Sequence, residues 1–159
     1  MTVTFTLNGA DAKFTGRAQA RLSDILRERF GLLGAKSSCL VGKCGFCVVL
    51  VDGSAGLACL IPAFALKGRA IVTIEGFSEG AAREDIDRGF AEAGLESCRY
   101  CEASRILVAE ALIGGATRPS KEAMLAAARG IGCRCCDPRL FARGIEKALE
   151  ARLGRLHGR

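Results

Sequence analysis

Eight of the nine cysteines in this chain of 159 residues fall into two sets of four. The first set follows the spacing C-x4-C-x2-C with a distant fourth cysteine, and the second follows C-x2-C and, 31 residues later, C-x-C. Disulfides cannot use an odd number of cysteines, and in a reducing compartment such clusters are more often metal ligands. We therefore expect the fold to be built around two metal sites. The two sets are Cys39, Cys44, Cys47 and Cys59, then Cys98, Cys101, Cys133 and Cys135.

The first set has the spacing of plant-type ferredoxins and predicts a 2Fe-2S cluster. Two bridged iron atoms need two thiolates each, so a short loop can supply three sulfurs while a later strand brings the fourth. Gly42 and Gly45 lie among these cysteines, and without side chains they let backbone amides approach the cluster sulfurs. Lys36 and Lys43 would add positive charge that favours the reduced state. Zinc or buried free cysteines are the alternatives, although zinc sites favour paired C-x2-C spacings.

The second set is less specific when it is taken alone. Its spacing is compatible with a second 2Fe-2S cluster or with a structural zinc site. The ninth cysteine, Cys136, directly follows Cys135 and leaves two interpretations open. A slip of one residue would make it an alternative ligand, whereas otherwise it is a small, half-buried thiol.

Composition and single residues exclude several other classes of protein. The net charge is +6, but much of the excess lies in the C-terminal tail, and one Tyr and no Trp leave few stacking platforms for nucleic acid. Gly31 to Ser37 is not a phosphate loop, since Ala35 stands where that motif needs glycine before lysine. His157 is the only histidine, which excludes a Rieske centre.

No segment of this sequence predicts membrane insertion or export. The N-terminus lacks the basic region and the apolar run of a signal peptide, and no apolar stretch approaches the roughly 18 residues of a spanning helix. We therefore expect a cytoplasmic protein.

The first half of the chain carries strand signals around one helix. Apolar residues alternate before the turn Asn8-Gly9, and later apolar runs have the length of buried strands. Helical spacing begins at Leu22, with Ser23 or Asp24 available as a cap. We therefore expect a β-grasp, ferredoxin-like domain over residues 1–77. The expected elements are strands at Val3 to Leu7, Ala12 to Thr15, Val48 to Val51 and Ala70 to Ile74, and a helix from Leu22 to about Phe30.

After Gly76 the strand signals give way to helical ones. Ser78-Glu79-Gly80 has the composition of a linker, and apolar residues then recur at helical spacing in four stretches. Short connections between such helices usually mean a bundle. The sequence thus predicts an α+β protein whose second domain, residues 82–155, is a four-helix bundle. The stretches are marked by Ile86, Phe90 and Ala93; Ile106, Leu107, Ala111 and Leu112; Met124, Leu125 and Ala128; and Leu140, Ile145 and Leu149.

Short motifs around the cysteines give the chain a wider resemblance. They are Leu22 to Arg27, Gly31-Leu32, Gly34-Ala35-Lys36, Cys44-Gly45, Val51-Asp52-Gly53, Ala58-Cys59-Leu60, Thr73-Ile74-Glu75-Gly76 and Cys133-Arg134-Cys135. Over nearly its whole length, the chain resembles the small iron-sulfur subunit of the molybdenum hydroxylases, the family of xanthine oxidase, aldehyde oxidase and aerobic carbon monoxide dehydrogenase.

The resemblance implies an electron relay with two 2Fe-2S clusters, one in the ferredoxin-like domain and one in the helical domain. It implies that substrate is oxidised at a molybdopterin centre on a large partner subunit. Electrons would pass through the second cysteine set, then the first, to an FAD-bearing partner in a hetero-oligomer such as a heterotrimer. The chain would thus be a subunit of an oxidoreductase and perform no bond chemistry alone.

The sequence departs from the family pattern around the second set. The usual Q-C-G-F-C-T-P-G is here Ser97 to Ser104, so Ser97 replaces the glutamine that contacts the pterin in the family. The usual G-N-x-C-R-C-T-G-Y is here Gly130 to Pro138, although Arg99 and Arg134 would still place positive charge beside the cluster. Two alternatives therefore stay open: a two-cluster subunit of a diverged complex without molybdopterin, or a regulatory protein with one 2Fe-2S cluster and one structural zinc site.

Overall fold

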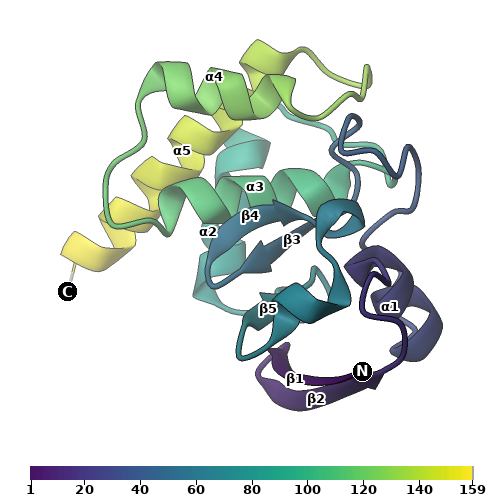
Figure 1. Cartoon of the computed structure of the whole chain (residues 1–159). Helices are drawn as coiled ribbons and strands as arrows, with labels where there is room; N and C mark the ends of the chain where they lie inside the picture. The colour runs from purple at the N-terminus through teal and green to yellow at the C-terminus, as the bar shows by residue number, and fades with distance from the viewer. Residues whose placement is uncertain (159) are drawn as a thin grey trace.

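The structure, a computed structural model, describes residues 1–158. A five-stranded mixed sheet with the strand order β2-β1-β5-β3-β4 forms the N-terminal half, and four of the five α-helices follow it (Figure 1). This confirms the expected α+β class. The strands are β1 (Thr2–Leu7), β2 (Ala10–Thr15), β3 (Val48–Val51), β4 (Ser54–Leu57) and β5 (Ala70–Val72), and helix α1 (Leu22–Arg29) lies between β2 and β3.

The first hairpin follows its sequence pattern. Val3, Phe5 and Leu7 alternate with threonines along β1, and all three are buried. Asn8 and Gly9 have φ angles of 52° and 82°, the left-handed pair that a two-residue hairpin turn requires. Strand β2 pairs antiparallel with β1 and begins slightly earlier than expected, at Ala10.

Strand β4 was not expected from the sequence. The segment Ser54–Leu57 is four residues long, contains a glycine and has no β-branched or aromatic residue, so its strand propensity is low. The turn before it does carry a strand signal, because Asp52 and Gly53 have φ angles of 50° and 82°, the same left-handed pair as in the first hairpin. This turn reverses the chain and pairs β4 antiparallel with β3.

Strand β5 is shorter than expected because the chain turns at Thr73. The buried Thr73 donates its backbone N–H to Asn8 Oδ1 at 2.8 Å, and its carbonyl accepts from the N–H groups of Gly76 and Phe77. These bonds replace the sheet ladder, so the strand ends at Val72.

The expected cap of α1 was wrong. The helix begins at Leu22, and Arg21 occupies the N-cap position without a side-chain hydrogen bond. Ser23 lies inside the first turn, where it is buried and donates to Asp24 Oδ1 at 3.2 Å.

Four helices follow residue 80, as the spacing of apolar residues predicted. Gly89 lets α2 pack closely against α5, since a Cβ atom there would overlap the backbone nitrogen of Ala148. No helix within residues 1–158 combines the length and apolarity needed to cross a membrane. The helices are α2 (Ala81–Ala93), α3 (Glu102–Ile113), α4 (Lys121–Arg129) and α5 (Pro138–His157); two short 3-10 helices, η1 (Ala58–Leu60) and η2 (Ala63–Leu66), lie between β4 and β5.

Strand β3 joins the two hydrophobic cores of the molecule. Val49 is fully buried in the core that contains β1 and α1. Val48 and Leu50 point to the opposite face and belong to the core built by the helices. Helix α3 lies beside β3 and β4 (Figure 1), so the helical half closes the second face of the sheet. The two halves therefore share buried surface.

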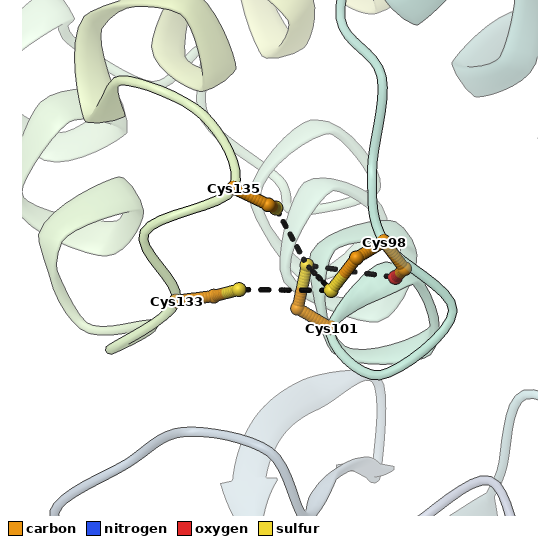
Figure 2. A group of neighbouring side chains, drawn as sticks. All are labelled: Cys98, Cys101, Cys133 and Cys135. Carbon is orange, nitrogen blue, oxygen red and sulfur yellow. Dashed lines mark hydrogen bonds between the residues drawn. The ribbon is translucent and has the colours of Figure 1, made fainter.

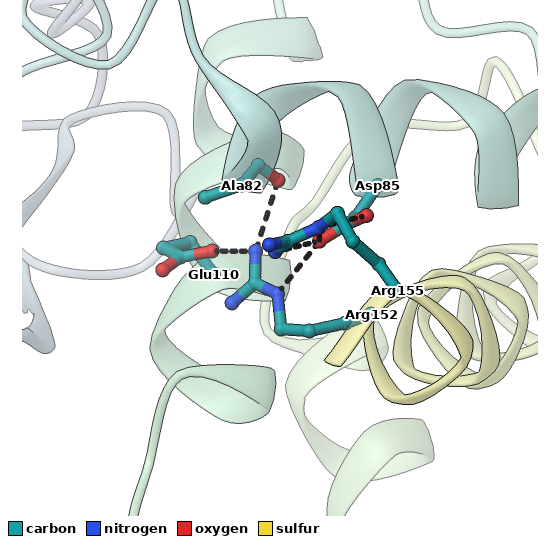
Figure 3. Close-up of polar contacts among 5 residues, drawn as sticks. All are labelled: Ala82, Asp85, Glu110, Arg152 and Arg155. Carbon is teal, nitrogen blue, oxygen red and sulfur yellow. Dashed lines mark hydrogen bonds and ion pairs between the residues drawn. The ribbon is translucent and has the colours of Figure 1, made fainter. Parts of the chain in front are cut away.

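A network of charged side chains joins α5 to α2 and α3 (Figure 3). Arg152 donates to Asp85 Oδ2 at 3.1 Å, to Glu110 Oε2 at 2.7 Å and to the carbonyl of Ala82 at 2.9 Å. Arg155 donates to Asp85 Oδ2 at 2.6 Å. The side chain of Asp85 is only 5% exposed, and the two arginines together compensate the charges of Asp85 and Glu110.

We expect Arg152→Met to lower the free energy of unfolding by about 3 kcal/mol, because the carboxylates of Asp85 and Glu110 lose a buried partner. Urea unfolding of the metal-loaded protein measures this loss. Arg83→Met is the control, since it removes a pair to the half-exposed Asp87 on α2 and should cost about 1 kcal/mol or less. Equal losses of unfolding free energy in the two variants would contradict the role of Arg152 as a buried ion-pair partner.

The pH dependence of the network follows from Asp85. Burial opposes its ionisation, but hydrogen bonds from Arg155 and Arg152 outweigh burial and hold the pKa of this carboxyl below its usual range. A pKa that is lower in the folded state stabilises the fold above the unfolded value of about 3.9. That contribution is lost as the pH falls through the folded pKa, so the difference between the parent protein and Arg152→Met should shrink there.

Candidate metal centres

The β3–β4 hairpin explains how the distant cysteine of the first set reaches the others. Cys47 directly precedes β3, and Cys59 follows β4 in η1. Val48 pairs with Leu57 at the open end of the hairpin, and the N–H of Ala58 donates to the carbonyl of Cys47 at 3.0 Å. Both cysteines are buried, so the hairpin register places two of the four thiols side by side.

The other two cysteines of the first set lie in the irregular loop before β3. The N–H groups of Lys43 and Cys44 both donate to Cys39 Sγ at 3.3 Å. Backbone N–H groups, of Val41 first and then Cys44, lower the pKa of Cys39 to about 6. Burial raises the pKa of Cys47 to about 12. The loop thus already supplies the N–H donors that a sulfur cluster needs.

Gly42 and Gly45 both have a φ of 74°, which a residue with a side chain rarely adopts. At Gly42 a Cβ atom would meet only the flexible end of Leu60. At Gly45 it would overlap the backbone carbonyl of Gly130, which lies in the loop of the second cysteine set. Gly45 therefore also permits a direct contact between the two loops. This second need for glycine at position 45 could not be seen from the sequence.

The second set gathers at the ends of three helices (Figure 2). Cys98 and Cys101 lie in the turn that opens α3, and Cys133 and Cys135 lie between α4 and α5. The Sγ atom of Cys98 is 3.6 Å from those of Cys101 and Cys133, and the Sγ atoms of Cys101 and Cys135 are 3.4 Å apart. All four sulfurs lie within 4.8 Å of one another, the only such group of potential metal ligands in the described part of the chain.

The thiols of the second set have contrasting environments. The backbone N–H groups of Cys101 and Tyr100 lower the pKa of Cys98 to about 6, against a smaller opposing effect of burial. Cys101 is fully buried, which raises its pKa far above the usual range. Metal binding to this set must therefore release protons, at least from Cys101.

A buried arginine that the sequence analysis did not identify stands beside this set. Arg105, one helical turn after Cys101, is only 2% exposed. Its guanidinium donates to Cys136 Sγ and, at 3.7 Å, to Cys135 Sγ. Its position, a charged residue within the apolar run of α3, was the sequence signal that could have identified Arg105 as a site residue. Cys136 itself is half-buried, lies outside the group of four sulfurs and contacts the guanidinium instead.

Two contacts join the cysteine loops to each other. The N–H of Gly132, next to Cys133, donates to the carbonyl of Cys44 at 2.9 Å. The rings of Phe46 and Tyr100 meet edge to face with centroids 5.0 Å apart. Each aromatic residue lies inside a C-x2-C unit, and this shared position was the signal that sequence reasoning missed.

Three buried polar atoms near the second set have no hydrogen-bond partner within residues 1–158: Ser97 Oγ, Ser104 Oγ and Arg105 Nε. Such orphaned donors are costly unless a further acceptor is present. A sulfide-containing cluster held by the four cysteines would be an acceptor of this kind, so the residues fit the group. Arg134 is exposed, and its role at the cofactor stays a prediction.

The donor set narrows the metals that this group could bind. Four sulfurs without imidazole or carboxylate suit soft metal centres, and both zinc and iron-sulfur clusters accept four thiolates. Geometry alone therefore does not separate these two at the second set.

Comparisons with protein families favour an iron-sulfur cluster over zinc at the second set. Residues 5–65 match the family described as a 2Fe-2S iron-sulfur cluster binding domain, and residues 73–146 match a second family described as a 2Fe-2S binding domain. The nicotinate dehydrogenase small FeS subunit of Eubacterium barkeri is 35% identical over 135 residues, which cover 85% of this chain and 86% of that one. The xanthine dehydrogenase iron-sulfur-binding subunit of Escherichia coli O157:H7 is 35% identical over 113 residues, covering 71% and 70%.

Solved structures agree with these matches. A chain of quinoline 2-oxidoreductase from Pseudomonas putida 86 superposes with a TM-score of 0.79 and 31% identity, and the match covers 97% of both chains. The aldehyde oxidoreductase of Desulfovibrio gigas superposes with a TM-score of 0.80 and 26% identity, covering 98% of this chain but only 17% of the larger one.

Adjacent cysteines offer a matched test of the second set. Cys135→Ala should remove one of two reduced-state EPR signals, because it removes one of the four gathered sulfurs. Cys136→Ala should keep both signals and the full iron content. Loss of iron from Cys136→Ala would instead identify Cys136 as a ligand, and an unchanged second signal in Cys135→Ala would indicate that Cys136 had replaced its neighbour.

Proposed function

Because this chain belongs to the family of small 2Fe-2S subunits of the molybdenum hydroxylases, we propose that it is the electron-transfer subunit of a larger oxidoreductase and performs no bond chemistry alone. Each 2Fe-2S cluster, when bound, supplies a carrier for one electron at a time. The proposed ligands are Cys39, Cys44, Cys47 and Cys59 for the first cluster and Cys98, Cys101, Cys133 and Cys135 for the second.

The contact between the two cysteine loops carries this proposal. Electron transfer between two metal centres needs a short, rigid path, and the hydrogen bond from the Gly132 N–H to the carbonyl of Cys44 directly joins the backbones of the two loops. The Phe46–Tyr100 ring pair gives a second contact between them. This direct contact between the loops supports a transfer of electrons from one site to the other.

We propose that electrons enter at the second set and leave from the first. The entry partner would be a large subunit with molybdopterin, and the exit partner would carry FAD. The relatives support separate partners, since the match covers 86% of the nicotinate dehydrogenase small FeS subunit and 97% of a chain of quinoline 2-oxidoreductase.

We also propose that each cluster is bound by a separate domain. Residues 1–77 would form the unit of the first cluster, and residues 82–155 would form the unit of the second, with α2 to α5 acting as a four-helix bundle. We also assign the protein to the cytoplasm, because no cysteine in the described residues is in a disulfide and a reducing compartment keeps thiols available as ligands.

One observation favours a second candidate, a complex whose catalytic cofactor is not molybdopterin. Ser97 stands where the family pattern has the glutamine that contacts the pterin, and its hydroxyl is buried without a partner in the described residues. A different group could therefore face the second set. The regulatory protein with a zinc site has less support, because the second half of the chain matches a 2Fe-2S binding domain.

Metal analysis of the anaerobically purified chain tests the relay. We expect about four irons and four sulfides per chain, two of each per cluster, and two reduced-state EPR signals. Half that iron together with one equivalent of zinc would contradict the relay and favour the regulatory protein.

Metal and cofactor analysis of the intact complex, captured through this chain, tests the partners. Molybdenum and FAD in the captured complex would support the proposed partners. A two-cluster complex without molybdenum would favour the second candidate.

The loop contact itself can be tested with two glycine variants. Gly45→Ala should change the magnetic interaction between the two EPR signals and slow electron transfer between the clusters, because the new Cβ atom would overlap the carbonyl of Gly130. Gly53→Ala is the control: its φ is 82°, but nothing lies within 4 Å of the added carbon, so it should cost only about 1–2 kcal/mol of backbone strain. Unchanged spin interaction and transfer rate in Gly45→Ala would argue against this path.

A further inference from the structure

Arg105 is a buried cation without a carboxylate partner. Its residue surface is 2% exposed, and no Asp or Glu within the described residues forms an ion pair with it. By contrast, the similarly buried Arg152 has two carboxylate partners. An isolated charge away from water is costly, so negative charge of another kind must compensate Arg105.

The atoms around the guanidinium identify that negative charge. Its hydrogen-bond acceptors are the sulfurs of Cys136 and Cys135, and its central carbon lies 5.0 Å from the ring centroid of Phe141. A neutral thiol is a weak acceptor and would not offset a buried cation. Thiolate sulfur of a metal-bound cluster would do so, because a 2Fe-2S cluster with four thiolates has a net negative charge.

We propose that Arg105 is the buried counter-ion of the second cluster and raises its reduction potential, an inference that rests on the proposed function. Reduction adds one negative charge to the cluster and removes none. A fixed guanidinium at the Cys135 sulfur therefore stabilises the reduced form more than the oxidised form. Arg105 is buried, so little water lies around the guanidinium to screen its charge, whereas Cys135 itself is exposed.

Two neighbouring side chains hold the guanidinium at this place. Phe141 of α5 receives it on the face of its ring, and Cys136 accepts one of its N–H groups. Cys136 stands where the family pattern has threonine, so the Arg105–Cys136 contact is a feature of this chain's own sequence. This gives the ninth cysteine a role as the anchor of the counter-ion, outside the set of four ligands.

An EPR-monitored redox titration of the intact chain tests the proposal. Arg105→Met removes the charge and keeps much of the volume, and it should shift the midpoint of the second cluster to a more negative potential. The signal that Cys135→Ala removes identifies the second cluster. The first cluster is the internal control, and its midpoint should stay the same in Arg105→Met.

Arg99→Met is the matched control variant. Arg99 is adjacent to the ligand Cys98 but exposed, so water screens its charge and its loss should shift the midpoint much less. Arg105→Lys keeps a charge without the forked donors and should give a negative shift smaller than that of Arg105→Met. If Arg105→Met fails to retain the second cluster, the shift in Arg105→Lys decides the question.

These experiments test the counter-ion role of Arg105 separately from the proposed electron relay. A midpoint that is unchanged in the Arg105 variants, or equal shifts in Arg99→Met and Arg105→Met, would overturn the counter-ion while leaving the relay intact. A parent protein with only one 2Fe-2S signal would overturn the relay itself, before any substitution is made.

Discussion

The packing of the helical half onto β3 is the contact on which the rest of this molecule depends. Val49 points into one hydrophobic core, while Val48 and Leu50 point into the other, so a strand of four residues belongs to both halves. Cys47 directly precedes this strand, and the contact of Gly45 with Gly130 lies just before it. The same packing that excludes water from the sheet thus sets the two cysteine loops against each other.

The helical half buries two arginines, and the charge of each is compensated in a different way. Arg152 is buried beside two carboxylates, so its charge is compensated within the protein by Asp85 and Glu110. Arg105 is buried among sulfurs and an aromatic ring, so its compensation depends on what the cysteines hold. The first arrangement stabilises the helix packing, and the second links the charge of the protein to the charge of its metal site.

Local patterns were sufficient for most elements because each depends on neighbouring residues. The alternation in β1, the left-handed turn at Asn8 and Gly9, and the helical spacing after residue 80 all predicted what the structure contains. Two misses among the strands have different causes. Strand β4 had a local signal in the turn at Asp52 and Gly53, but its own residues have low strand propensity. Strand β5 ends early because of a distant contact, the hydrogen bond from the Thr73 N–H to Asn8 Oδ1.

The sequence by itself determined that this chain has two sets of four thiols and the glycines that one loop needs, because ligand type and spacing are properties of the chain. Only the tertiary structure decided that the two loops touch through Gly132 and Cys44, and that Arg105 stands beside the second set. The physical reason is that burial and the loss of water around a charge arise when separate segments pack. No local pattern of residues records which distant segment will be the neighbour.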